Sequence, residues 1–192
     1  MKSQSSLPIG YEEFYSVDLQ NDKKMAFLIN FFAIVIALVF GIPAHFAIPI
    51  STLFSMDDGI SNYFIRFLAL AVLSVAYIIL HELVHGLAMK LCGTKKIKFG
   101  FTGMYAFAGS DDYYYKKPYI FIALAPVVLW GIVLAVVNIF VPTSWFWVVY
   151  FIQLFNLSGA AGDLFVTFKF LRFPKDILVK DYGVKMIVYS QK

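Results

Sequence analysis

Apolar residues in this sequence gather into four long runs separated by short polar segments. A helix that crosses a hydrocarbon core about 30 Å thick needs about 20 mainly apolar residues, because lipid offers no partner for unpaired backbone groups. Gly41, Pro43 and Pro49 predict a kink or an early end in the second half of the first run. We expect transmembrane helices at residues 25–50, 67–89, 119–141 and 145–168.

The connection between the second and third runs has a different pattern. Apolar residues alternate with other residues at positions 97–102, Gly103 interrupts this pattern, and residues 104–108 form a second short stretch. This pattern predicts a short β-hairpin. The tail at residues 177–189, broken at Gly183, is a further candidate strand. The pattern therefore predicts an all-α polytopic membrane protein with four transmembrane helices and a hairpin between helices two and three, in one domain over residues 1–192.

Composition and charge support this class of protein. Hydrophobic residues make up 60% of the chain and charged residues 15%, whereas about a quarter of the residues of soluble domains are charged. Lys and Arg are concentrated before the first run, between the second and third, and after the fourth, whereas residues 51–61 and 142–144 contain neither. Positive loops stay in the cytoplasm, so we expect both termini and the hairpin there. The net charge of +4 then reflects topology and not affinity for nucleic acid.

The second run contains the sequence His-Glu-Leu-Val-His-Gly at residues 81–86. On a helix, His81 and His85 lie one turn apart on the same face, where two imidazoles can bind one zinc ion. Glu82 falls within the same arc and is placed to act as general base toward a water. A hydrogen-bonded cluster without metal is the alternative. It is disfavoured because ionisable residues in a membrane helix cost about 2.5–3.5 kcal/mol each without compensation.

A catalytic zinc site needs a third protein ligand, and Asp163 is the only charge in the fourth run. At 1.5 Å per residue, Asp163 lies about 13 Å from the cytoplasmic end of its helix, and His85 and His81 lie about 10 and 16 Å from theirs. These depths agree. The alternatives for Asp163 are an interhelical salt bridge or a helix end near the interface. The weaker candidates for third ligand are His45, Asp57, Asp58, Asp111 and Asp112.

Asn156 lies two helical turns before Asp163, on nearly the same face of the predicted helix. Its amide can hydrogen-bond either a substrate backbone or a neighbouring helix. The intervening residues 158–162 are small and allow another backbone to approach closely, with helix packing the favoured use. Asn156 is therefore a candidate substrate-binding residue with an equally supported packing role.

These motifs together resemble the putative zincin peptidase family, a group of small membrane proteins similar in pattern to site-2 proteases. The resemblance implies that His81, His85 and Asp163 bind Zn²⁺, that Glu82 is the general base, and that the reaction is hydrolysis of peptide bonds near the cytoplasmic membrane face. The residues that carry it lie at 81–86, 96–101, 123–126 and 156–163.

We therefore expect an integral protein of a bacterial cell membrane that uses zinc to cleave a protein or peptide, such as a transmembrane segment. The lipid bilayer is its expected surrounding. One alternative is a catalytically inactive membrane scaffold that binds zinc for stability. A divalent-cation transporter is less favoured, because the first and third runs offer few polar residues for an ion pathway, namely Asn30, His45 and Asn138.

Overall fold

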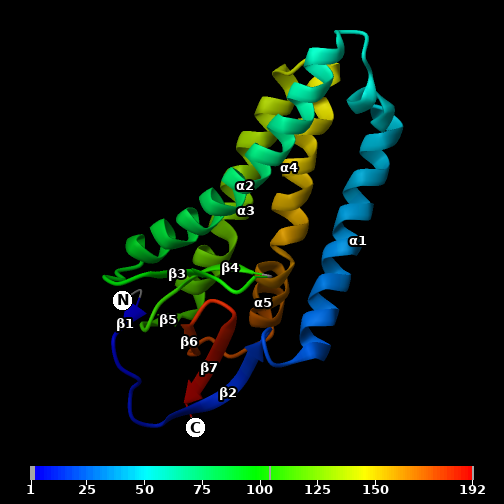
Figure 1. The fold of residues 1–192 in the computed structure, drawn as a ribbon. Coiled ribbons are helices and arrows are strands. Elements are labelled where there is room, and N and C mark those ends of the chain that lie inside the picture. Colours follow the sequence, from blue (N-terminus) through cyan, green and yellow to red (C-terminus); the bar gives the residue numbers. More distant parts are fainter. Residues whose placement is uncertain (1–2, 104, 192) are drawn as a thin grey trace. The chain divides into compact units, whose positions relative to one another are not determined.

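The computed structural model describes residues 3–103 and 105–191, and most of this part of the chain is helical (Figure 1). The helices are α1 (Lys23–Ala47), α2 (Ile60–Leu91), α3 (Lys116–Phe140), α4 (Phe146–Gly159) and α5 (Ala161–Leu171), with short 3-10 helices at Ile50–Phe54 and Thr143–Trp145. The strands are β1 (Ser3–Gln4), β2 (Tyr11–Asp18), β3 (Lys98–Phe101), β4 (Ala106–Gly109), β5 (Tyr113–Tyr115), β6 (Leu178–Asp181) and β7 (Lys185–Gln191).

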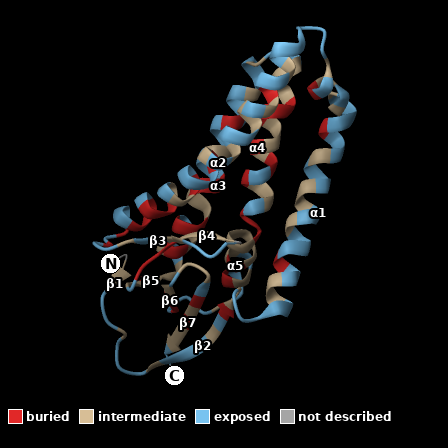
Figure 2. Ribbon diagram, viewed as in Figure 1, coloured by how far each residue is buried: buried red, intermediate tan, exposed pale blue. Residues whose placement is uncertain are grey.

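Three helices, α1, α2 and α3, are long and apolar enough to cross a membrane. Most of their large apolar side chains are exposed, and in α1 the exposed fractions of Phe27 and Phe46 are 73% and 82%. Figure 2 colours most of α1 as exposed or intermediate. Such a surface needs apolar surroundings. Helix α2 has 32 residues and is therefore about 48 Å long, more than the thickness of a hydrocarbon core. Helix α1 runs through Gly41 and Pro43 and ends at Ala47, before Pro49.

The fourth apolar run does not form the single helix expected at residues 145–168. It forms α4 and α5, which are interrupted at Ala160 and bent by 41°. Gly159 and Gly162 flank the interruption, and each glycine lowers helix stability by about 1 kcal/mol relative to alanine. Four spans would require this bent pair to cross as one, so the predicted number of spans stays a prediction.

The chain divides into two compact units. The first contains Met1–Asn30, Glu82–Pro126 and Gly162–Lys192, and the second contains Phe31–His81 and Val127–Ala161. Helix α2 is continuous across the division, which falls between His81 and Glu82. All the strands of the described chain belong to the first unit.

The first unit contains a five-stranded antiparallel sheet in the order β1-β5-β6-β7-β2. An all-α class is therefore wrong for this protein, although the expected tail strand is confirmed as β6 and β7. The sequence signal for β2 is weak because Val17 is its one buried residue. This strand depends on pairing with β7, from Tyr11 with Gln191 to Asp18 with Lys185, and a bulge lies between Glu13 and Tyr15.

A separate two-stranded sheet joins β3 and β4 between α2 and α3. Lys98 pairs with Gly109 and Phe101 with Ala106, so the predicted strand pair is present. The second strand begins at Ala106; Met104, where we expected it to begin, lies outside the described residues. The cytoplasmic location of this hairpin stays a prediction.

The core of the first unit lies where the sheet packs against parts of α2, α3 and α5. Tyr114, Phe170, Val179 and Val188 are fully buried within it. The turn between β6 and β7 contacts β4, since Gly183 lies against the ring of Phe107 and the N–H of Ser110 donates to the carbonyl of Asp181 at 2.8 Å. This contact joins the hairpin to the sheet.

We expect Gly183→Ala to destabilise the protein more than Gly10→Ala does. Both glycines have positive φ, of +96° and +88°, so alanine costs about 1–2 kcal/mol at either position. At Gly183 a Cβ would also overlap the ring of Phe107, whereas nothing lies within 4 Å at Gly10. The measurement is the thermal unfolding midpoint in detergent, and equal losses in the two variants would contradict the described packing.

Candidate metal centre

One face of α2 holds the polar residues of the candidate site. Tyr77, His81 and His85 follow one another at intervals of four residues, so their side chains lie on one stripe of the helix. All three are buried, and each histidine is 8% exposed. The stripe continues through buried Met89 to Cys92, next to the end of the helix. Burial of this face explains why polar side chains here need partners.

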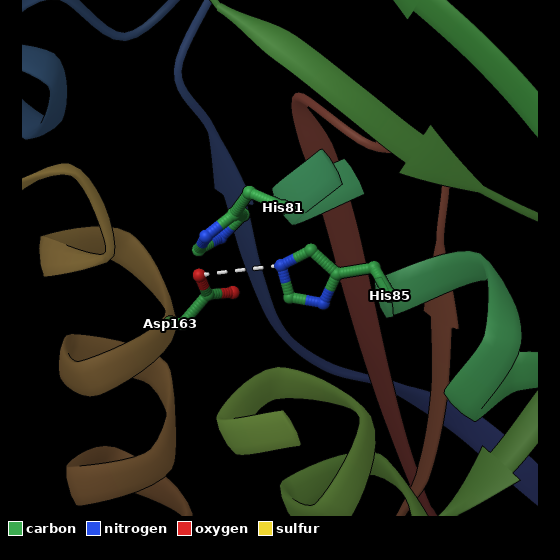
Figure 3. A group of neighbouring side chains, drawn as sticks. All are labelled: His81, His85 and Asp163. Atoms are coloured by element: carbon green, nitrogen blue, oxygen red, sulfur yellow. Dashed lines mark ion pairs between the residues drawn. The ribbon is translucent and has the colours of Figure 1, made fainter. Parts of the chain in front are cut away.

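Asp163 lies in the first turn of α5 and faces the two histidines (Figure 3). The interruption at Ala160 starts a new helix just before it, and a carboxylate is favourable near a helix N-terminus. Its Oδ2 lies 3.5 Å from Nε2 of His85. One nitrogen from each of His81 and His85 and one carboxylate oxygen of Asp163 all lie within 4.8 Å of one another.

The distance between His85 and Asp163 fits a shared zinc ion. With Zn–N and Zn–O bonds of about 2.0–2.2 Å in a tetrahedral arrangement, two ligand atoms are about 3.4 Å apart. The 3.5 Å between His85 Nε2 and Asp163 Oδ2 agrees with this value and is long for a direct hydrogen bond. Two imidazoles and one carboxylate are also the donor set of a common class of catalytic zinc site.

His85 is held by the backbone of α3. Its Nδ1 lies 3.0 Å from the carbonyl oxygen of Ile122. Because a carbonyl oxygen only accepts, Nδ1 carries the hydrogen of this bond, and Nε2 is the atom that faces Asp163. A hydrogen bond of this kind fixes ring orientation in metal-binding histidines.

The structure places Asn156 with other helices. It is fully buried on α4, its Oδ1 accepts from the hydroxyl of Tyr77 at 2.9 Å, and its Nδ2 donates to the carbonyl of Val127 at 3.1 Å. The Tyr77 hydroxyl also lies 2.6 Å from Nδ1 of His81. Asn156 and Asp163 lie on two different helices, α4 and α5, and not on two turns of one helix as predicted.

Glu82 follows His81 on α2 and is half-buried. Within the described chain, the group of possible ligands comprises His81, His85 and Asp163, and Glu82 is not a member. The Glu82 carboxylate therefore does not share the mutual approach of the three candidate ligands, and it was expected to be a general base and not a ligand. Its predicted role as general base is a matter for experiment.

The weaker ligand candidates have partners elsewhere. Nδ1 of His45 accepts the backbone N–H of Ile50, Asp58 forms an ion pair with buried Arg66 at 2.6 Å, and Asp111 forms one with Lys98 at 2.7 Å. The guanidinium of Arg66 lowers the pKa of the Asp58 carboxyl below its ordinary value. These contacts agree with the expectation that Asp163 is the stronger candidate.

The glycine after the second histidine provides the contact between α2 and the hairpin. A Cβ on Gly86 would lie 2.5 Å from Cζ of Phe99, in strand β3. A side chain at position 86 would require the ring of Phe99 to move away from the helix at this point. The hairpin is thereby held one residue beyond His85.

Two functional candidates were missed in the sequence, namely Tyr77 and Asp181. Tyr77 could have been found from its position one turn before His81. Asp181 had no such signal, because β6 brings it to Tyr119, whose hydroxyl donates to Oδ2 at 2.6 Å. Burial raises the pKa of Asp181 from 3.8 to about 6, despite hydrogen bonds from Tyr119 and from the N–H of Gly183.

Comparison with known proteins identifies the family. Residues 74–178 match the family described as putative zincin peptidase. This match covers more than half of the chain, and the chain belongs to that family. The matched region contains His81, Glu82, His85 and Asp163. Membership supports zinc-dependent peptidase chemistry at the level of the family.

An individual relative is also known. The chain is 30% identical over 137 residues to an uncharacterized 24.7 kDa protein in the gap 5' region of Pyrococcus woesei. The aligned part is 69% of this chain and 59% of the relative, so the chain spans less than two thirds of that protein. No solved structure matches the chain.

Asp181→Asn is expected to change the pH dependence of stability. The folded pKa of about 6 exceeds the ordinary value of 3.8, so the folded state binds more protons between these values. The contribution of Asp181 to the free energy of unfolding therefore falls as pH rises from about 4 to 6, and asparagine removes that fall.

The measurement is the unfolding midpoint of chelator-treated protein from pH 4 to 7, so that metal binding does not add to the profile. Asp111→Asn is the matched control, because Lys98 lowers the pKa of Asp111 and the effect has the opposite sign. An unchanged profile in Asp181→Asn would show that the pKa of Asp181 is the same in the folded and the unfolded protein.

Proposed function

We propose that this chain is an integral membrane zinc metalloprotease that hydrolyses a peptide bond of a protein or peptide substrate near the cytoplasmic face. The observation that carries the proposal is the approach of His81, His85 and Asp163 within 4.8 Å of one another, on the helix that contains HExxH. Membership of the putative zincin peptidase family supports the same chemistry.

In this proposal His81, His85 and Asp163 hold the metal. Zinc supplies Lewis-acid chemistry that activates water and a carbonyl group toward hydrolysis. The Asp163 carboxylate offsets part of the positive charge of the ion, which matters because burial of an uncompensated charge is costly. The hydrogen bond of His85 to Ile122 keeps its Nε2 directed toward Asp163.

Glu82 acts as the general base and then as the general acid. Its carboxylate accepts a proton from the attacking water and passes it to the leaving amine. General acid–base catalysis of this kind typically increases the rate by about 10²–10⁴-fold. It is suited to this role because it adjoins a candidate ligand on α2 without belonging to the ligand group. The substrate must present an extended backbone, since a helix hides its own peptide groups.

The sheet supports a location at the cytoplasmic face. It joins the N-terminal segment, the connection between α2 and α3, and the C-terminal segment through strands β2, β5, β6 and β7. These three segments therefore lie on one side of any membrane that the helices cross. They also carry most of the Lys residues, which the positive-inside rule assigns to the cytoplasm. That the membrane is a bacterial one stays a prediction.

The test is metal content and hydrolysis of detergent-purified variants. Wild type is expected to hold about one zinc per chain, His85→Ala and Asp163→Ala to lose it, and Glu82→Gln to retain it while hydrolysis falls by about 10²-fold or more. The probe is a random-sequence mixture of quenched fluorescent peptides added to protein reconstituted in liposomes.

His45→Ala and Asp111→Ala are matched controls, and both should keep zinc and activity, because these residues bond elsewhere. Equal zinc in wild type and Asp163→Ala would refute the ligand set. Zinc binding with the same cellular function in Glu82→Gln would instead favour the inactive scaffold. Transport of divalent cations into liposomes by wild type would favour a transporter.

A further inference from the structure

A buried chain of hydrogen bonds joins His81 to two residues outside the HExxH motif. The hydroxyl of Tyr77 lies 2.6 Å from Nδ1 of His81 and 2.9 Å from Oδ1 of Asn156. The Nδ2 of Asn156 lies 3.1 Å from the carbonyl of Val127. Tyr77 and His81 are 6% and 8% exposed and Asn156 is fully buried. All four residues belong to the second unit.

The partners fix the direction of every bond in this chain. The carbonyl of Val127 only accepts, so Asn156 donates to it from Nδ2, and Oδ1 is turned toward Tyr77. An amide oxygen also only accepts, so the hydroxyl of Tyr77 donates to it. A tyrosine hydroxyl has one hydrogen, and toward His81 it must therefore accept. The hydrogen of this last bond belongs to Nδ1 of His81.

We propose that Tyr77 and Asn156 are positioning residues that hold His81 in the tautomer with a lone pair on Nε2. This inference rests on the proposed zinc site, where Nε2 of His81 is the ligand atom. The carbonyl of Val127 fixes the orientation of the Asn156 amide, which fixes the direction in which the Tyr77 hydroxyl donates. That direction in turn determines which nitrogen of His81 carries the hydrogen. The backbone carbonyl of Ile122 does the same for His85 in a single step.

Packing holds Tyr77 in the orientation that this role requires. Its ring meets the ring of His81 edge-on at 5.6 Å and the ring of Trp130 at 6.3 Å. Leu134, Val149 and Ile152 form a buried cluster with it. A hydroxyl fixed in this way loses little conformational entropy when it accepts a bond from His81.

The same contacts favour a positioning role for Asn156 over substrate binding. Both the oxygen and the nitrogen of its carboxamide have partners within the chain, and the side chain has no exposed surface. A substrate would have to displace Tyr77 or Val127 to reach it. Of the two roles considered for Asn156, the contact with neighbouring helices agrees with its surroundings.

The first test reads the tautomer directly in metal-free protein. Nitrogen-15 NMR of His81 should show a protonated Nδ1 and an unprotonated Nε2 in wild type. Tyr77→Phe should replace this signal by a mixture of tautomers, because the acceptor for Nδ1–H is gone. Ser74→Ala is the matched control, since Ser74 lies one turn earlier on α2 and its hydroxyl donates to the carbonyl of Leu70 in the same helix. A protonated Nε2 in wild type would overturn the inference.

The second test is zinc affinity measured by competition with a chelator. Tyr77→Phe should bind zinc about 10–100-fold more weakly, the usual effect of losing an outer partner of a metal-binding histidine. Asn156→Leu should weaken binding as well, and the double variant should be no weaker than Tyr77→Phe, because Asn156 acts through Tyr77. Ser158→Ala, which loses only a bond to Leu154 on α4, should match wild type.

The outcomes separate this inference from the proposed function. If Asn156→Leu keeps the zinc affinity of wild type but raises KM for the peptide mixture, Asn156 contacts substrate and the inference is wrong. If wild type binds no zinc, the proposed function is wrong, and the NMR result still decides the tautomer of His81. Unfolding midpoints of the metal-free variants establish that each is folded.

Discussion

The approach of Asp163 to His85 is the contact on which the candidate metal centre depends. A helix that enters lipid must compensate each ionisable side chain, and α2 carries His81, Glu82 and His85 within two turns. Asp163 reaches this group from the first turn of α5, close enough to His85 for one cation to join both. The interruption at Ala160 creates that first turn. The interruption between α4 and α5 thus places the Asp163 carboxylate beside the histidines.

His81 and His85 each carry a hydrogen on Nδ1 in the proposed site, but different partners accept it. His85 relies on one backbone carbonyl, which no substitution at Ile122 removes. His81 relies on two side chains, from α2 and α4, and on a carbonyl of α3. A substitution can therefore remove the contacts of His81, whereas it leaves the carbonyl contact of His85 in place.

Much of the site and part of the fold followed from the sequence. Length and apolarity were sufficient for α1, α2 and α3, and helical spacing was sufficient for the histidine pair, because both signals are local. Asp163 could be selected because a lone charge in an apolar run needs a partner. The five-stranded sheet was missed because the strength of β2 lies in its pairing with β7 and not in its own pattern. Asp181 was missed for the same reason, since its partner Tyr119 comes from a distant segment, whereas the spacing of Tyr77 one turn before His81 was available in the sequence.

The pairing of β2 with β7 also sets an order of events during biogenesis. Tyr11 leaves the ribosome early, yet its partner Gln191 is made only after every helix of the described chain. Helical segments can enter the bilayer as they are synthesised, whereas long-range strand pairing has to wait for both strands. In the proposed zinc site, a metal ion could likewise bind His85 and Asp163 only after α5 has been made. If the apolar helices insert into a membrane as they are made, the sheet and the proposed metal site form late, on a chain that is already inserted.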